Sequence, residues 1–152
     1  MKKGALPLPG EPPRNTRCTA LDTMLVFAQS PDRPPVPLIA DLRYDTADPY
    51  AVCLVLHIDK ARTVPWFFAR CLLTDGIVRP VGEGDVIASP VTVRGAASVR
   101  VTLRSPSSSV DVHLPLRALR SFLRKTDAMV RPGTEHLHLD LDDLTHRLTD
   151  GS

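Results

Sequence analysis

The chain has 152 residues, of which 43% are hydrophobic and 24% are charged, so it can bury one ordinary hydrophobic core. Its formal net charge of +2 is far from the concentrated positive charge that phosphate backbones usually demand. The cysteines Cys18, Cys53 and Cys71 form no CxxC pair, which excludes an encoded disulfide framework or zinc site and favours a reducing cytoplasm.

The amino-terminal region is rich in proline, because eight of the fifteen prolines fall within residues 1–37. We therefore expect residues 1–15 to form a flexible tail and residues 16–152 to form a single domain. The same prolines interrupt the apolar region that a signal peptide would need, and no later run approaches membrane-spanning length. The sequence predicts no membrane insertion.

The first half of the domain alternates apolar and polar residues in the way that is typical of strands with one buried face. Four strands are predicted, at residues 16–29, 36–44, 51–58 and 62–68. Their short connections favour an antiparallel sheet. The third strand is largely apolar on both faces, so we expect both faces to be covered.

The second half begins with a short helix at residues 69–76, in which Gly76 is expected to end the helix in the left-handed conformation. Residues 82–85 indicate a turn. Three more strands are predicted, at residues 85–89, 97–104 and 110–114. Helices are predicted at residues 115–130 and at residues 141–148. The order predicts an α+β, β-rich fold with two antiparallel sheet-plus-helix halves.

The helix at residues 115–130 has the clearest amphipathic pattern in the chain. Its core-facing residues are Leu116, Leu119, Phe122, Leu123 and Val130. Arg117, Arg120 and Arg124 form a different stripe. A solvated face is the simpler interpretation of this stripe, and the alternative is a site for an acidic partner or nucleic acid.

No catalytic pattern is encoded, since the chain lacks a G-x-S-x-G elbow, an HExxH motif and a P-loop. Asp45 and Asp48 lie in a predicted turn, where aspartate side chains accept backbone N–H bonds, so the pair needs no catalytic role. The flanking Tyr44 and Tyr50 are expected to tie this hairpin to the body of the domain. We predict neither catalytic residues nor a cofactor.

His136, His138 and Asp140 would share one face of an extended segment and could supply three metal ligands. The leucines that alternate with them explain the same segment as a half-buried strand. We therefore predict no metal site.

Phe67 stands apart from the other aromatic residues of its strand. Val64, Trp66 and Phe68 share the expected core face, whereas Phe67 points the other way. An exposed aromatic side chain at this position favours a subunit contact.

Five segments occur in order across most of the chain: LRYDTADPYAV (42–52), WFFARCLLTDG (66–76), RPVGEGDV (79–86), ALRSFLRKTD (118–127) and PGTEH (132–136). Together they resemble the landmarks of the SsgA-like proteins of sporulating actinomycetes. Cys71, Pro65 and the segment 87–90 depart from the family pattern, which indicates a divergent paralogue of the member that recruits the tubulin-like division protein FtsZ.

This resemblance implies a non-enzymatic regulator of sporulation-specific cell division that works through protein–protein contacts. It implies a homotrimer with a whirly-like, barrel-shaped body, partners such as FtsZ or other SsgA-like proteins, and a place at division septa. The alternative function is binding of single-stranded nucleic acid, which the low aromatic content and weak net charge disfavour. Arg117, Arg120, Arg124 and Phe67 are the residues predicted to contact partners.

Overall fold

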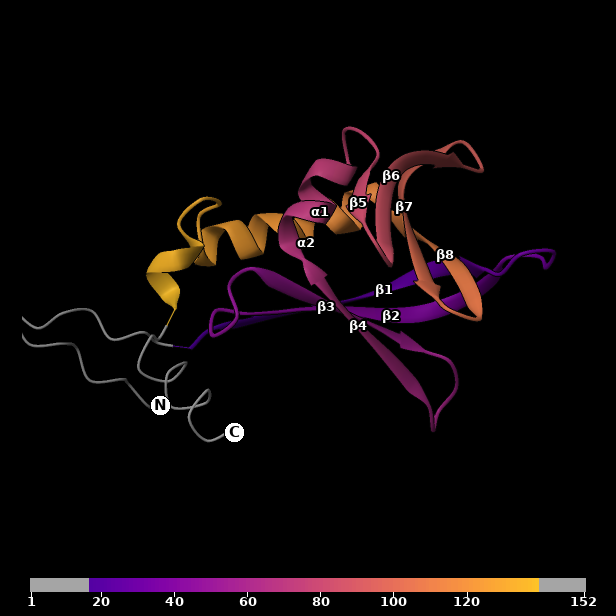
Figure 1. Cartoon of the computed structure of the whole chain (residues 1–152), viewed down its shortest axis with the longest axis horizontal. Helices are drawn as coiled ribbons and strands as arrows, with labels where there is room; N and C mark the ends of the chain where they lie inside the picture. Colours follow the sequence, from indigo (N-terminus) through magenta and orange to yellow (C-terminus); the bar gives the residue numbers. More distant parts are fainter. Residues whose placement is uncertain (1–16, 140–152) are drawn as a thin grey trace, which may run out of the picture.

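Eight antiparallel strands form one curled sheet in the order β4-β3-β2-β1-β8-β7-β6-β5, with two helices on its inner side (Figure 1). The computed structural model describes residues 17–139. The strands are β1 (Thr19–Gln29), β2 (Val36–Asp45), β3 (Ala51–His57), β4 (Thr63–Ala69), β5 (Val81–Glu83), β6 (Val86–Val93), β7 (Ala96–Ser105) and β8 (Ser108–Pro115). The helices are α1 (Arg70–Gly76), α2 (Leu116–Met129) and the 3₁₀ helix η1 (Glu135–His138).

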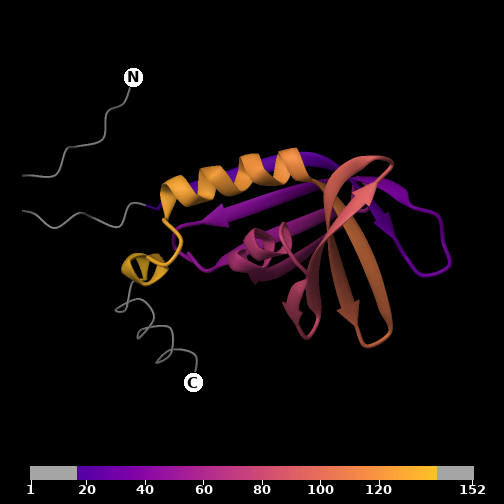
Figure 2. The same ribbon diagram turned by 90° about the horizontal axis from the view of Figure 1, so that it is seen from above.

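The predicted α+β fold class is confirmed. The chain divides into two halves, the first with strands β1–β4 and helix α1, and the second with strands β5–β8 and helix α2. The halves are continuous, because β1 pairs with β8 where Phe27–Gln29 meet Asp111–His113. This pairing covers only three residues of each strand, so the two halves diverge on either side of it. Figure 2 shows the second half curling away from β1 and β2 while α2 runs along β1.

The second half has one strand more than the sequence predicted. Val81–Glu83 forms β5 and pairs with β6, whereas Gly82 within it and Gly84 just after it had indicated a turn. Gly82 has φ +147°, and a Cβ there would lie 2.5 Å from the Val86 carbonyl oxygen. The glycine therefore serves close strand pairing, and the reversal of the chain follows at Gly84, whose φ is +68°.

Gly76 ends α1 as predicted, but the expected left-handed conformation is wrong. Gly76 does not have a positive φ, and the following Ile77 keeps right-handed helical angles. A Cβ on Gly76 would lie 2.6 Å from the Cβ of Ala88. The glycine is needed because α1 packs directly against β6.

The amphipathic prediction for α2 is confirmed. Leu119, Phe122 and Leu123 are buried against the sheet, while Val130, just after the helix, is also buried but already extended. The core lies between the inner face of the curled sheet and the two helices.

The carboxy-terminal segment differs from its prediction. Residues 135–138 form η1 in place of the half-buried strand. The helix turns here because Thr134 and Glu135 make local hydrogen bonds, from Thr134 Oγ1 to the Arg131 carbonyl and from the Gly133 N–H to Glu135. The predictions for residues 1–15 and 141–148 lie outside the described residues.

Candidate protein-interaction surfaces

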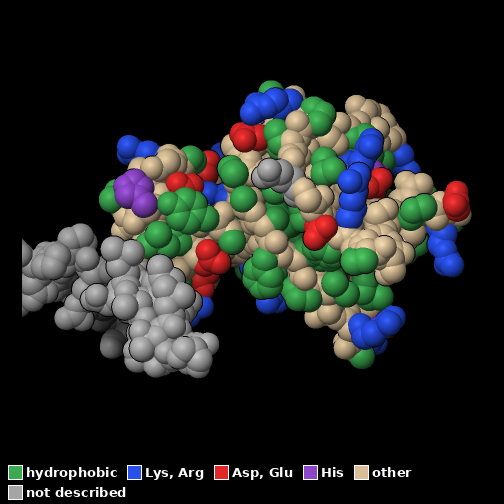
Figure 3. Space-filling view, viewed as in Figure 1, with side chains coloured by type: hydrophobic (Ala, Val, Ile, Leu, Met, Phe, Trp, Pro, Cys, Tyr) green, Lys and Arg blue, Asp and Glu red, His purple; other side chains and the backbone are tan. Residues whose placement is uncertain are grey.

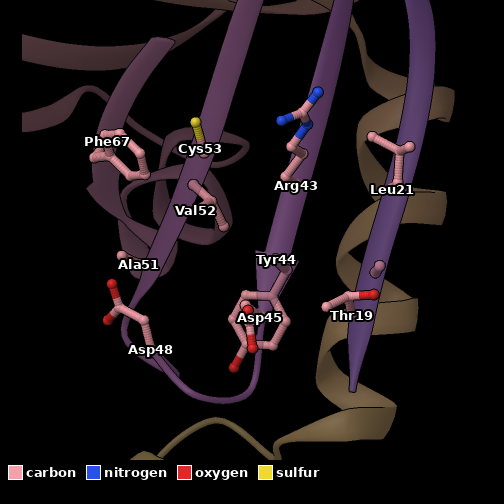
Figure 4. Close-up of a pocket in the computed structure, with 11 residues that line it drawn as sticks. Thr19, Leu21, Arg43, Tyr44, Asp45, Asp48, Ala51, Val52, Cys53 and Phe67 are labelled. Atoms are coloured by element: carbon pink, nitrogen blue, oxygen red, sulfur yellow. The ribbon is translucent and has the colours of Figure 1, made fainter. Parts of the chain in front are cut away.

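The four strands of the first half expose a side that no helix covers, which we call the outer face. Side chains alternate along a strand, so cross-strand neighbours share a face. One row across the sheet contains Leu21, Arg43, Cys53 and Phe67, and Figure 4 shows these four side by side with α2 behind the sheet. A second row adds Leu25, Ile39, His57 and Thr63.

Large apolar side chains of the outer face remain exposed to water. The exposed fractions are 57% for Leu21, 51% for Leu25, 47% for Ile39 and 69% for Phe67. Scattered apolar residues are ordinary on protein surfaces, but four on one flat sheet face form a patch of the kind that marks a contact. The exposure of Phe67 agrees with its sequence prediction.

A hydrogen-bonded charge network centred on Asp41 connects the two rows. Asp41 is buried there and accepts a bond from Thr23 Oγ1 at 2.6 Å, and its other oxygen lies 2.9 Å from His57 Nε2. The Arg43 guanidinium lies 3.6 Å from the same carboxylate oxygen of Asp41 that faces His57. Burial alone would raise the pKa of Asp41, but the bonds from Thr23 and His57 and the nearby charges outweigh it and lower the pKa. The network holds its strands in register.

A hollow of about 450 Å³ opens on the outer face near the turn between β2 and β3 (Figure 4). Leu21, Arg43, Cys53 and Phe67 form its walls. Burial raises the pKa of the Cys53 thiol, so this cysteine is a packing group and a poor nucleophile. The hollow combines apolar area with the charged side chains of Arg43, Asp45 and Asp48 at its rim.

The turn itself shows why its sequence is so specific. Asp45 accepts the Ala47 N–H at 2.9 Å and pairs with Arg17, so it shapes the turn as expected. The Tyr44 hydroxyl donates to the Pro49 carbonyl at 2.8 Å, and burial raises the pKa of Tyr44 to about 12. This bond closes the hairpin turn, and the buried Tyr44 ring, which packs against Arg70, connects the hairpin to the body as predicted. The Tyr50 side chain is exposed and only its carbonyl takes part, accepting the Arg70 N–H.

Arg70 is a buried charge that the sequence interpretation did not single out. Its guanidinium donates to the carbonyls of Thr126 at 3.1 Å and Val130 at 2.8 Å, at the carboxy-terminal end of α2. It also pairs with Glu135 at 2.9 Å and lies 5.0 Å from the centre of the Tyr44 ring. A cation is favourable at this end of a helix, where carbonyls lack partners. Arg70 therefore fastens α1, α2 and η1 to the hairpin.

The predicted arginine stripe lies on the side of α2 that faces solvent. Arg117, Arg120 and Arg124 are exposed and line a hollow of about 430 Å³ with Ala97 and Leu116. We call these three arginines the α2 arginine face. Since the buried side of α2 faces the sheet and Phe67 is on the sheet's other side, the predicted partner-binding residues form two separate surfaces.

Metal-binding geometry is not found among residues 17–139, where no three His, Cys, Asp or Glu side chains gather closely enough to hold an ion. His136 and His138 lie on η1, and Asp140 is outside the described residues. No helix in the described part of the chain is long and apolar enough to cross a membrane.

Comparison with known sequences identifies relatives across most of the chain. The family described as "Streptomyces sporulation and cell division protein, SsgA" matches residues 38–135. The sporulation-specific cell division protein SsgB of Streptomyces coelicolor is 50% identical over 116 residues, covering 76% of this chain and 85% of the relative. SsgB of Saccharopolyspora erythraea is 38% identical over 135 residues, covering 89% and 95%.

Solved structures agree in fold as well as in sequence. A structure from work on SsgB mutations that correlate with longitudinal cell division in Streptomyces coelicolor has a TM-score of 0.77 and 43% identity, covering 81% of this chain and 97% of that one. The SsgA-like sporulation-specific cell division protein of Thermobifida fusca also has a TM-score of 0.77, with 35% identity and coverage of 86% and 95%. The chain belongs to the SsgA family of sporulation and cell division proteins.

Proposed function

We propose that this protein is a non-enzymatic regulator of sporulation-specific cell division that acts through contacts with other proteins and with copies of itself. Family membership supports the process, because relatives up to 50% identical carry the name sporulation-specific cell division protein. The outer face supports the mode of action, because four large apolar side chains stay exposed on one sheet face.

Self-association on the outer face would remove this apolar area from water. Leu21, Leu25 and Phe67 are each more than half exposed, so burying each one contributes about 1 kcal/mol or more to association. A homotrimer, as the family resemblance implies, would bring several such faces together and build a composite surface. The partners expected for that surface are division proteins, with FtsZ or another SsgA-like protein as the leading candidates.

The free edge of β4 does not provide an equivalent contact. In an antiparallel ladder, hydrogen-bonded and non-hydrogen-bonded residue pairs alternate. The Arg70 N–H donates to the Tyr50 carbonyl and the Ile58 N–H donates to the Arg62 carbonyl, which identifies Val55 and Pro65 as a non-hydrogen-bonded pair. Pro65 accordingly occupies a position that faces away from β3, where it has no N–H to offer another strand. This favours face-to-face packing over extension of the sheet.

Localisation of a fluorescent fusion in sporulating filaments tests the proposal. Wild-type protein should form ladders at the septa that disappear when FtsZ rings are absent. A variant with Phe67→Asp and Leu25→Asp should lose the ladders, while Val78→Asp, which changes an equally exposed apolar residue beyond α1, should keep them. A uniform signal from wild-type protein throughout sporulation would contradict the proposal.

A further inference from the structure

We propose that the α2 arginine face binds an acidic segment of a partner protein, at a site separate from the outer face. Arg117, Arg120 and Arg124 follow the i, i+3, i+7 spacing of one helix face and span about 10 Å along the axis of α2. The helix cannot turn this face away from solvent, because Leu119, Phe122 and Leu123 fix its opposite side in the core.

The three charges are not neutralised by the part of the protein that the structure describes. Among the carboxylates of residues 17–139 whose side chains the structure describes, none lies within ion-pair distance of Arg117, Arg120 or Arg124. Other cations nearby are used internally: Lys125 pairs with Asp22 at 2.5 Å, and Arg70 pairs with Glu135. The α2 arginine face therefore concentrates positive charge that the described part of the fold does not pair.

The shape of the face favours a peptide with several carboxylates. The arginines border a hollow of about 430 Å³ whose floor includes Leu116 and Ala97, so an occupant meets both charge and some apolar surface. A guanidinium binds a carboxylate through two parallel hydrogen bonds, which a lysine cannot reproduce. Carboxylates one helical turn apart would match the arginine spacing.

Nucleic acid fits the same face less well. Single-strand binding sites combine cations with aromatic side chains on which bases stack. Phe122 is the aromatic residue of α2, and it is fully buried on the opposite side of the helix. Three arginines without a stacking platform are better matched to a short acidic peptide than to a nucleic-acid strand.

The binding experiment uses full-length protein and a fluorescently labelled peptide of alternating glutamate and alanine, with a glutamine version as the uncharged probe. Fluorescence anisotropy should show that the protein binds the glutamate peptide and does not bind the glutamine peptide. Arg117→Glu with Arg124→Glu should weaken that binding at least about tenfold, because two attractive contacts become repulsive.

The matched control reverses Arg33 and Arg104 to glutamate. Both residues are exposed and lie away from α2, and either double variant changes the net charge from +2 to −2. Binding by the control should stay within about twofold of wild type, since screened charges at a distance contribute little. Circular dichroism and sedimentation of each variant separate loss of the site from loss of folding or self-association.

The outcomes are distinct. Equal weakening in both double variants would overturn the proposal, because it would show a response to overall charge. Failure of wild-type protein to bind the glutamate peptide would also overturn it. Tighter binding of a single-stranded DNA oligonucleotide, lost in the Arg117/Arg124 variant, would replace the acidic segment with nucleic acid. None of these results bears on whether the outer face self-associates.

Discussion

The outer face and the α2 arginine face lie on opposite sides of the same sheet and are built on different physical principles. The outer face is apolar at Leu21, Leu25, Ile39 and Phe67, and its one buried carboxylate is already engaged. The α2 arginine face has three exposed cations and no internal partner among the described residues. The first should respond to loss of apolar area, and the second to salt and charge.

This difference would let one small domain contact two kinds of partner. A sheet with one face packed against its helices can give the other face to association. A helix that seals the core can give its solvent side to a second partner. Figure 3 shows one face of the molecule, on which hydrophobic side chains gather over β3 and β4. Charged side chains of both signs are scattered around them.

Replacement of Arg70 should have the largest effect, because this residue holds the two surfaces in one rigid body. Arg70→Ala removes the side-chain donor to the Val130 carbonyl, one of the two donors to the Thr126 carbonyl, and the ion-pair partner of Glu135. We expect a loss of about 3–5 kcal/mol in the free energy of unfolding, measured by chemical denaturation. Arg62→Ala, which breaks an exposed pair with Asp59, should cost less than about 1 kcal/mol. Equal losses would show that Arg70 has no special structural role.

Asp41 tests whether the charge network supports the outer face. Asp41→Asn should cost about 1.5–3 kcal/mol at neutral pH, because two charge-assisted hydrogen bonds are weakened. The pKa of Asp41 is lowered by folding, so its contribution is present above the ordinary aspartate value near about 3.9 and is lost as the pH falls through the lower folded value. The difference between the two proteins should therefore shrink in strong acid. A difference that is constant from neutral to acidic pH would contradict this account.

Salt should separate the two surfaces directly. Raising salt from about 0.05 M to about 0.5 M shortens the screening length several-fold, so binding of the glutamate peptide should weaken about tenfold. Self-association through apolar area should change by less than about twofold over the same range. Parallel anisotropy and sedimentation titrations provide the comparison. Equal salt dependence of both processes would mean that they share one surface.

Tyr44→Phe should have the smallest effect. The change removes the donor to the Pro49 carbonyl and leaves the ring beneath Arg70, so we expect a cost of about 1 kcal/mol in unfolding free energy. Tyr50→Phe is the matched control, because the Tyr50 side chain is 48% exposed and its hydroxyl makes no hydrogen bond to the residues that the structure describes. Thermal unfolding of the two variants measures the difference, and a larger cost for Tyr50→Phe would contradict the assigned role of Tyr44.

Much of the fold could be predicted where periodicity extends over many residues. The first four strands and α2 have long patterns, and the structure has them within a few residues of the predicted bounds. Shorter or tertiary features were missed. Strand β5 has only three residues, of which the middle one is Gly82, and Gly84 follows it, so its local pattern cannot be distinguished from a turn. Gly76 is determined by its distance to Ala88 in another element, which no local rule contains.

The candidate surfaces were predictable only in part. Exposure of Phe67 and of the α2 arginines follows from strand and helix periodicity. Leu21, Leu25 and Ile39 join Phe67 only through the cross-strand register, which depends on pairing between distant segments. Arg70 looks like an ordinary charged residue in the sequence. It is buried because α2 and η1, which lie more than fifty residues later in the chain, pack over it.

Sedimentation equilibrium of three proteins tests the central claim most directly: wild type, the Phe67→Asp and Leu25→Asp double variant, and Val78→Asp. Our account predicts a species of three times the chain mass for wild type and Val78→Asp, and a folded monomer for the double variant. A monomeric wild-type protein at micromolar concentration, or a double variant that assembles as wild type does, would contradict it.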